Sequence, residues 1–368
     1  MERYLEQCLD SIRSQTFPDF ECIVVNDGST DKTRAIIETY TKKDHRFRAV
    51  HKENGGVSSA RNAGFAEAIG EYTIFLDGDD FFSPSLLERL YDCIKKVDAD
   101  IAVCNFQSYF ESMSKYSEAK INFSPFGRHD TVSYETNPDD IFNVPTLMLW
   151  NKLIRTDLLQ REHIRNNEKL HRAEDIDFMG RVLASAKSMV FVDENLVFYR
   201  TDTGVSSTKE LYKYPYDVLR ALDNLKDYLT SKQLYEKVKK SYAKIAIYHI
   251  LAHLYFTETN PAHKPIYTKA KKFLVSLDID DINRYVDDEK TANEVKMILS
   301  SDYESWLRFR IVDLRDDREA KYISYLLGEY QRKYDEEKEL RDRMLESLSW
   351  KVTRPLRTVS KKLRRRKR

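Results

Sequence analysis

Cysteine is scarce in this chain and follows no metal-binding pattern. Among 368 residues only Cys8, Cys22, Cys93 and Cys104 are cysteines, and they lack the close pair spacing of zinc sites. The sequence also opens without a signal-peptide pattern, which indicates a reducing, cytoplasmic location. We therefore expect neither zinc binding nor structural disulfides.

Long hydrophobic runs are missing as well. No apolar run approaches the roughly 18 residues that a spanning helix needs, so the sequence predicts no transmembrane helix. Nor do we find a Gly-rich P-loop, a Ser/His/Asp or Cys/His signature, or a metalloprotease spacing among the eight histidines. The length allows about two domains with buried cores.

Charge is nearly balanced overall but unevenly distributed. The formal net charge is +1, yet residues 351–368 hold ten Lys or Arg and no acidic residue, which leaves −9 for residues 1–350. Apolar residues recur every three or four positions through residues 345–363, with Trp350 beside them. Such a basic amphipathic helix binds anionic membrane surfaces. Nucleic acid and a solubilising tail are the alternatives, and the acidic body favours the membrane over nucleic acid.

The first hundred residues alternate between β-branched runs and capped amphipathic stretches, a pattern typical of a parallel sheet flanked by helices. We expect strands at residues 21–25, 46–51, 72–76 and 100–106, with helices over about 31–42, 57–69 and 83–97. Residues 109–145 look irregular, a helix follows over 174–186, and two short strands follow at 189–192 and 196–199. From about residue 211 onward we expect helices, broken near 260–261 and 278–281, with the last over about 317–347.

Two acidic turns follow predicted strands. Asp27 comes after the first strand, and Asp77-Gly78-Asp79-Asp80 comes after the third. Ligands of open α/β sheets bind beyond the carboxyl ends of the strands, so one crevice can hold both turns. Two aspartates separated by one small residue suit a hard divalent cation, which takes oxygen ligands, although this pattern is also ordinary turn chemistry.

Three further positions suit ligand binding. The carboxylate of Asp27 can accept hydrogen bonds from a base or ribose, or it can simply cap a turn. Arg61 lies one turn into a helix that follows two glycines. An anion at the start of this helix would meet free amides, and a surface arginine is the alternative. Glu174 and Asp175 open a later helix, where the helix dipole alone favours acids, but where a carboxylate can also act as a general base.

Together these segments resemble family 2 glycosyltransferases of the GT-A fold, notably bacterial members that build surface polysaccharides. The resemblance covers residues 2–205, through residues 5–31, 54–64, 77–80, 150–153 and the pair Glu174-Asp175. It implies an α/β fold, a GT-A Rossmann-like, mostly parallel sheet with flanking helices, followed by a helical C-terminal region. We expect the nucleotide-sugar half at 1–108, the acceptor and catalytic-base half at 109–208, helices at 209–348 and the basic tail at 349–368.

The resemblance also implies roles for single residues. Asp27 would contact the uracil or ribose side of the donor, and Arg61 would lie near the nucleotide. Asp77 and Asp79 would form the DxD motif that holds Mn²⁺ or Mg²⁺, with Asp79 as the direct ligand. Asp175 would be the catalytic base. Two more positions match the family pattern: Lys152, placed near the substrate, and Arg200, to which we assign no role.

One family element is missing. The first strand of the family, an apolar central strand, would precede Met1, where the following helix already starts. Without it, two neighbouring strands would keep unpaired backbone groups. We expect that the sequence is a truncated reading of a longer gene.

The resemblance predicts transfer of a sugar from a nucleotide-sugar donor, most simply a UDP-sugar, to a hydroxyl of a cell-surface glycan with inversion. The acceptor is expected to be lipid-linked or polymeric, at the inner face of the cell membrane, and no nucleic acid partner is expected. A sugar nucleotidyltransferase and an inactive scaffold subunit are the alternatives.

Overall fold

The computed structural model describes residues 1–117, 121–124, 131–201, 213–258 and 260–313, together with residues 332, 336, 338 and 339. The chain divides into two compact units, residues 1–295 and 296–368. The predicted tail at 349–368 lies outside the described residues, as does almost all of the helix predicted at 317–347. The division into four parts that the sequence predicts, at 1–108, 109–208, 209–348 and 349–368, stays a prediction.

The N-terminal segment alternates helices and strands as its sequence pattern predicts. It runs α1 (Glu2–Arg13), β1 (Cys22–Asp27), α2 (Thr33–Lys43), β2 (Phe47–Lys52) and α3 (Val57–Glu67). β1 and β2 pair in parallel from Cys22 opposite Phe47 to Asp27 opposite Lys52. Gly56, with φ +86°, begins α3 in a backbone conformation that side-chain-bearing residues rarely adopt.

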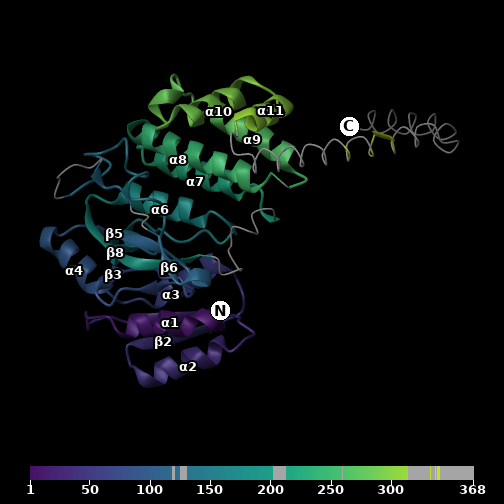
Figure 1. Cartoon of the computed structure of the whole chain (residues 1–368). Coiled ribbons are helices and arrows are strands. Elements are labelled where there is room, and N and C mark those ends of the chain that lie inside the picture. Colours follow the sequence, from purple (N-terminus) through teal and green to yellow (C-terminus); the bar gives the residue numbers. More distant parts are fainter. Residues whose placement is uncertain are drawn as a thin grey trace, which may run out of the picture. The chain divides into compact units, whose positions relative to one another are not determined.

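A second sheet, with six strands, is the larger of the two sheets, and Figure 1 labels β3, β5, β6 and β8 in it. Its strands are β3 (Tyr72–Thr73), β4 (Phe81–Phe82), β5 (Ile101–Phe110), β6 (Lys115–Tyr116), β7 (Lys152–Arg155) and β8 (Met189–Thr201). The order is β3-β7-β5-β8-β4, and β6 pairs with β5.

The two longest strand pairings are parallel, and the shorter pairings are antiparallel. β1 with β2 and β5 with β8 are parallel, whereas the pairs β3·β7, β5·β7, β5·β6 and β4·β8 are antiparallel. The reason is that repeated strand–helix–strand crossovers end at β5, after which the chain returns through β6 and β7 against β5.

Two strand predictions differ from the structure in extent. The strand predicted at 72–76 is paired only over Tyr72–Thr73, which lie opposite Arg155 and Ile154 of β7. The two short strands predicted at 189–192 and 196–199 form one strand, β8, with a register shift opposite residues 104–106. A bulge of this kind lets one strand continue past an unpaired residue.

The core lies between the sheets and their covering helices. α1 buries Leu5, Cys8, Leu9 and Ile12, spaced three or four residues apart on one helical face. α4 (Leu86–Val97) buries Leu86, Leu90 and Ile94 in the same way, and both faces belong to one apolar cluster.

Helices dominate the rest of the described chain. They are α5 (Thr156–Arg161), α6 (Glu174–Ser185), α7 (Asp217–Ser231), α8 (Tyr235–Phe256), α9 (His263–Ser276), α10 (Glu289–Ser300) and α11 (Tyr303–Asp313), with 3₁₀ turns at Glu111–Met113 and Ile282–Arg284. The predicted breaks near 260–261 and 278–281 are confirmed. α6 approaches α7 closely at Gly180, where a Cβ would lie 2.4 Å from a Leu225 methyl. Across the part of the chain that the structure describes, no helix has the length and apolar character to cross a membrane.

Candidate active site

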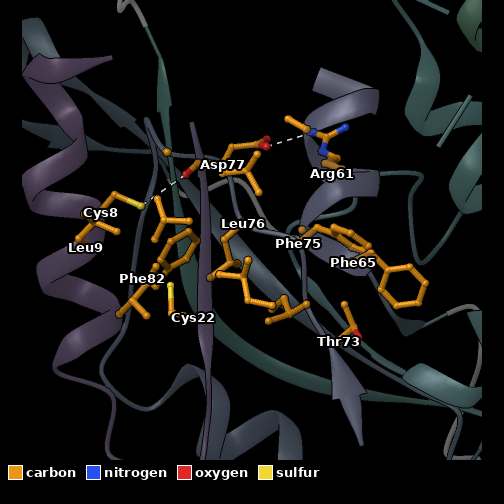
Figure 2. A pocket seen from close by; sticks show the side chains of 18 of the residues that line it. Cys8, Leu9, Cys22, Arg61, Phe65, Thr73, Phe75, Leu76, Asp77 and Phe82 are labelled. Carbon is orange, nitrogen blue, oxygen red and sulfur yellow. Dashed lines mark hydrogen bonds and ion pairs between the residues drawn. The ribbon is translucent and has the colours of Figure 1, made fainter. Parts of the chain in front are cut away.

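One large cavity extends to the carboxyl end of β1 and to the acidic turn at residues 77–80. Its volume is about 1250 Å³, and its polar wall carries Asp27, Arg61, Asp77, Asp79 and Asp175. The prediction that both acidic turns open onto one crevice is thereby confirmed. Figure 2 shows Asp77 pointing toward Arg61 at one end of this cavity. The candidate base thus shares a cavity with the candidate metal ligands.

The acidic turn is fastened to β8. Within the turn, the backbone N–H of Asp80 donates to the carbonyl of Asp77 at 3.2 Å. From β8, the Nε of Arg200 donates to the carbonyl of Asp79 at 2.8 Å, and its backbone N–H donates to Oδ1 of Asp80, also at 2.8 Å. Asp80 is buried, and burial raises its pKa to about 8. Asp80 therefore supports the turn, while Asp77 and Asp79 line the cavity.

Arg200 is a positioning residue for this turn. Its guanidinium is buried, pairs with Glu111 and donates from Nη2 to the side-chain oxygen of Gln7 at 2.6 Å. It also lies 4.7 Å from the ring centroid of Tyr4, a cation–π contact. The sequence singled out Arg200 without a role, and these contacts show that it ties β8 and α1 to the acidic turn.

The carboxylates of Asp77 and Asp79 fit a divalent cation. Burial raises the pKa of Asp79, and the neighbouring charge of Asp77 raises it further. A cation bound here would stabilise the charged form of both carboxylates. In the described part of the chain no three His, Cys, Asp or Glu side chains gather into a metal-binding group. Mg²⁺ commonly binds one or two carboxylates and takes its other ligands from substrate phosphates and water. The residues present therefore suit Mn²⁺ or Mg²⁺.

Arg61 joins the two halves of the site. Its Nη2 donates to Oδ1 of Asp77 and its Nη1 to Oε1 of Glu174, each at 3.0 Å. The side chain is only 14% exposed, so the alternative of an ordinary surface arginine is wrong. Burial alone would lower the pKa of Arg61, but the two carboxylates outweigh it and raise the pKa. A permanent positive charge therefore lies between the acidic turn and α6.

Asp175 occupies the first turn of α6. The helix begins after Ala173, whose φ of +58° turns the chain sharply, and the N–H of Ile176 donates to Oδ1 of Asp175 at 2.9 Å. Burial raises the pKa of Asp175 well above its ordinary value, and the charge of Glu174 raises it further. Carboxyl groups with raised pKa values in clefts are candidates for general bases.

Asp27 is held by the loop that precedes α3. Its Oδ1 accepts from Nζ of Lys52 at 2.7 Å and from the N–H of Gly55 at 2.9 Å, and its Oδ2 accepts from the N–H of Gly56 at 2.8 Å. Burial would raise the pKa of Asp27, but these hydrogen bonds outweigh it and lower the pKa. Asp27 therefore fixes the loop of residues 52–56 while it also lines the cavity.

Lys152 does not lie on the cavity wall. It is fully buried, and its Nζ donates to the carbonyl of Met148 and to Oδ1 of Asn151, both at 2.7 Å. Asn151 in turn donates to the carbonyl of Cys104 in β5 at 2.8 Å. Burial lowers the pKa of Lys152 to about 7. Its predicted place near the substrate stays a prediction.

Two residues on the cavity wall were not singled out by the sequence. Arg172 lies two positions before Glu174 and adds a second cation to this end of the cavity. Tyr199 stacks on Trp150, with ring centroids 5.6 Å apart and planes 8° apart, and is 37% exposed. The only hint in the sequence was that these residues lie close to Glu174 and Arg200. A single Arg or Tyr is not part of a recognisable motif by itself.

Comparison with known proteins supports a family assignment. The sequence model described as "Glycosyl transferase family 2" matches residues 2–160. Glycosyltransferase GlyG of Streptococcus pneumoniae serotype 4 (strain ATCC BAA-334 / TIGR4) is 31% identical over 212 residues, 55% of this chain and 68% of that protein. Uncharacterized glycosyltransferase EpsJ of Bacillus subtilis (strain 168) is 33% identical over 217 residues, 58% of this chain and 61% of EpsJ. The match thus spans about three fifths of EpsJ.

A solved structure has the same fold. The crystal structure of S. aureus TarS superposes with a TM-score of 0.61 at 20% identity, covering 83% of this chain and 52% of TarS. The expected α/β fold of the GT-A type, with a helical C-terminal region, is confirmed.

Proposed function

We propose that this chain, which belongs to glycosyl transferase family 2, transfers a sugar from a nucleotide-sugar donor to a hydroxyl of a cell-surface glycan. The observation that carries the proposal is the single cavity onto which Asp77, Asp79 and Asp175 open. Sugar transfer from a nucleotide needs two things at one place, compensation of the diphosphate charge and a base for the acceptor, and these carboxylates with Arg61 supply both.

We assign the donor side of the cavity to residues 1–108. Asp79 and Asp77 would hold Mn²⁺ or Mg²⁺, which when bound neutralises the charge that develops on the departing diphosphate. Arg61 adds a fixed positive charge beside Asp77. Asp27 shapes the nucleotide side by holding residues 52–56, and we propose a uracil nucleotide there. Lys152 would act indirectly, through its hydrogen bond to Asn151, which donates to Cys104 of β5.

Asp175 acts on the acceptor. Its carboxylate removes the proton of the acceptor hydroxyl, whose oxygen bonds to the anomeric carbon as that carbon's bond to the diphosphate oxygen breaks. The nucleoside diphosphate departs from the opposite side, so the configuration inverts. The transition state has oxocarbenium character, as in glycoside hydrolysis. A raised pKa supports this role because it makes Asp175 a stronger base than an ordinary carboxylate.

The acceptor is proposed to be a lipid-linked or polymeric glycan at the inner face of the membrane. One relative, 26% identical over 232 residues, is named poly(ribitol-phosphate) beta-N-acetylglucosaminyltransferase TarS of Staphylococcus aureus (strain MW2), and its name specifies a polymeric acceptor. The basic tail would bring the enzyme to such an acceptor.

A product analysis tests the proposal. The chain is incubated with UDP-sugars, Mn²⁺ and glycan acceptors, and UDP, pyrophosphate and labelled glycan are quantified. UDP release coupled to glycan labelling is expected. A parallel incubation contains UTP and a sugar 1-phosphate instead, and pyrophosphate release there would support the nucleotidyltransferase. If neither product forms, and if UDP with Mn²⁺ does not raise the melting temperature of the chain, our proposal is wrong. The chain is then better described as an inactive scaffold subunit.

A further inference from the structure

We propose that Asp217, the first residue of α7, is a positioning residue that holds the start of α6 and thereby sets where the carboxylate of Asp175 lies. The inference rests on the proposed function, in which Asp175 is the base. It extends the site into the helical region, where the sequence offered no candidate residue.

The carboxylate of Asp217 binds the backbone just before α6. Its Oδ2 accepts from the N–H of His171 at 2.9 Å and from the N–H of Arg172 at 3.3 Å. Its side chain is only 1% exposed, so the carboxylate depends on protein donors in place of water. Hydrogen bonds to a carboxylate are stronger than those between neutral groups, so both N–H groups are held firmly. The proposed base follows three residues after Arg172.

The bonds to residues 171 and 172 separate Asp217 from an ordinary helix acid. An acid in the first turn of a helix is common because it interacts favourably with the dipole of its own helix. The two backbone donors to Asp217 lie 46 and 45 residues earlier in the chain. Its ion-pair partner Arg220, at 3.0 Å, is 63% exposed, whereas the carboxylate is buried against the distant segment. Asp217 therefore serves that segment as well as α7.

The segment before α6 is also held at its other end, by α3. Oδ1 of Asn62 accepts from the N–H of Asn166 at 2.9 Å, and Nδ2 of Asn62 donates to the carbonyl of Asn166 at 2.9 Å. These bonds and those of Asp217 lie on either side of residues 167–170, so the segment is not free to move as a whole. The end that Asp217 holds is the one nearer to Asp175.

α7 also packs along the rest of α6 (Figure 1). Gly180 approaches the side chain of Leu225 in the middle of α6. Near the end of α6, the hydroxyl groups of Ser185 and Tyr228 lie 2.6 Å apart in a hydrogen bond. The contact at Asp217 is the one nearest in sequence to the proposed base. Its loss should matter for catalysis, because misplacing a reacting group by roughly 1 Å can reduce the rate about 10²-fold.

The test compares the full chain with its variants Asp217→Asn and Asp217→Leu. Asn keeps a side-chain oxygen that can accept from both N–H groups, and Arg220 is exposed enough to turn to water. Leu has no acceptor. The measurements are amide hydrogen exchange at residues 171 and 172, kcat with the donor and glycan that give transfer in the product analysis, and the affinity for UDP with Mn²⁺.

Asp217→Leu should speed exchange at residues 171 and 172 at least about tenfold, because their N–H groups lose their acceptor. It should lower kcat by about 10- to 100-fold, because the base is misplaced. The affinity for UDP with Mn²⁺ should stay unchanged, because the donor side does not contain this segment. Asp217→Asn should behave nearly as the wild type. If Asp217→Leu does not fold, Asp217→Ala replaces it, since its smaller side chain lets water reach the two N–H groups.

Leu229→Ala is the matched control for a loss of stability. Leu229 is fully buried toward the other end of α7, and truncation of a buried leucine destabilises a protein. This variant should lower the melting temperature and leave both kcat and the exchange at residues 171 and 172 unchanged.

Four outcomes would overturn the positioning role. They are unchanged exchange in Asp217→Leu, faster exchange with an unchanged kcat, an equal loss of kcat in Leu229→Ala, and an equal loss of kcat in Asp217→Asn, which keeps the acceptor. If the wild type transfers no sugar, the proposed function fails separately. The exchange at residues 171 and 172 then decides by itself whether Asp217 holds the start of α6.

Discussion

At Asp175, the surroundings change what a carboxyl group can do. An aspartate in water has a pKa of about 4, whereas burial and Glu174 raise the pKa of Asp175. At Asp27 the balance is opposite, because donors from Lys52, Gly55 and Gly56 outweigh burial and lower the pKa. Both residues looked alike in sequence, an acid beside a turn or at a helix start, and their difference comes from neighbours remote in the chain.

Substitution of Asp175 by Asn tests the base directly. Asn cannot accept a proton but has nearly the same shape, so turnover should fall by about 10²–10⁴ while donor binding changes little. Initial rates and calorimetric titration with UDP measure the two effects. Asp157→Asn, on an exposed side chain of α5, is the matched control and should retain full activity. Loss of activity and donor binding together would show that Asp175 is structural.

The pH dependence of activity provides an independent check. Asp175 must be deprotonated to act as base, so kcat/KM should fall as pH drops through its raised pKa, at higher pH than for an ordinary carboxyl. Glu174→Gln removes the neighbouring negative charge, which should lower the pKa of Asp175 and move the acid limb to lower pH. A limb that stays in place, or that moves to higher pH, would contradict this assignment.

Asp79 is the predicted direct ligand of the metal ion, so its substitution tests the metal site. Asp79→Ala should weaken UDP binding in the presence of Mn²⁺ at least tenfold and should leave the weaker, metal-free binding unchanged. Titration calorimetry with and without EDTA measures this difference. Asp92→Ala, at an exposed position of α4, serves as control. Equal Mn²⁺ dependence in wild type and Asp79→Ala would remove Asp79 as a ligand.

At the scale of elements, the acidic turn owes its position to strand β8. Arg200 connects that strand to Asp79, Glu111 and Gln7, which are remote from it in sequence. The turn itself is short and polar, so its own residues do not fix its geometry. The geometry of the turn is fixed instead by the buried guanidinium of Arg200, which donates hydrogen bonds to three different segments of the chain.

Arg200→Met should therefore loosen the turn. The side chain keeps about the same length, but Glu111 and the carbonyl of Asp79 each lose the hydrogen bond from Arg200. We expect a loss of up to about 3 kcal/mol in the free energy of unfolding. Mn²⁺-dependent UDP binding should also weaken. Arg89→Met is the matched control, because Arg89 also pairs with a glutamate but is 50% exposed, and it should cost no more than about 1 kcal/mol. Similar effects in both variants would deny Arg200 a positioning role.

Elements with a strong local pattern were predicted well, and those that depend on partners were not. α2, α3, α4 and α6 follow from apolar spacing and caps, and the strands β1 and β2 from β-branched runs. Residues 72–76 have the same composition as a strand, yet only Tyr72–Thr73 pair. A strand is defined by hydrogen bonds to a neighbour, so its length is set outside its own sequence.

At the scale of the whole molecule, the basic tail remains a prediction, because residues 349–368 lie outside the described residues. Deletion of residues 351–368 should release the chain from vesicles that contain anionic lipid. The loss should be greatest at low salt, because charge attraction to the surface is screened as ionic strength rises. Vesicle sedimentation at several salt concentrations measures this, with neutral vesicles as control. Equal partition of both versions would favour a solubilising or oligomerisation role.

The sequence by itself determined the fold class, the order of most elements and the candidate residues, because helix periodicity, strand composition and turn motifs are local properties. Only the tertiary structure decided that Asp79 and Asp175 share a cavity, that Arg61 contacts both acidic segments and that Lys152 is buried away from the wall. Such facts depend on contacts between residues far apart in the chain, and local sequence patterns do not contain them.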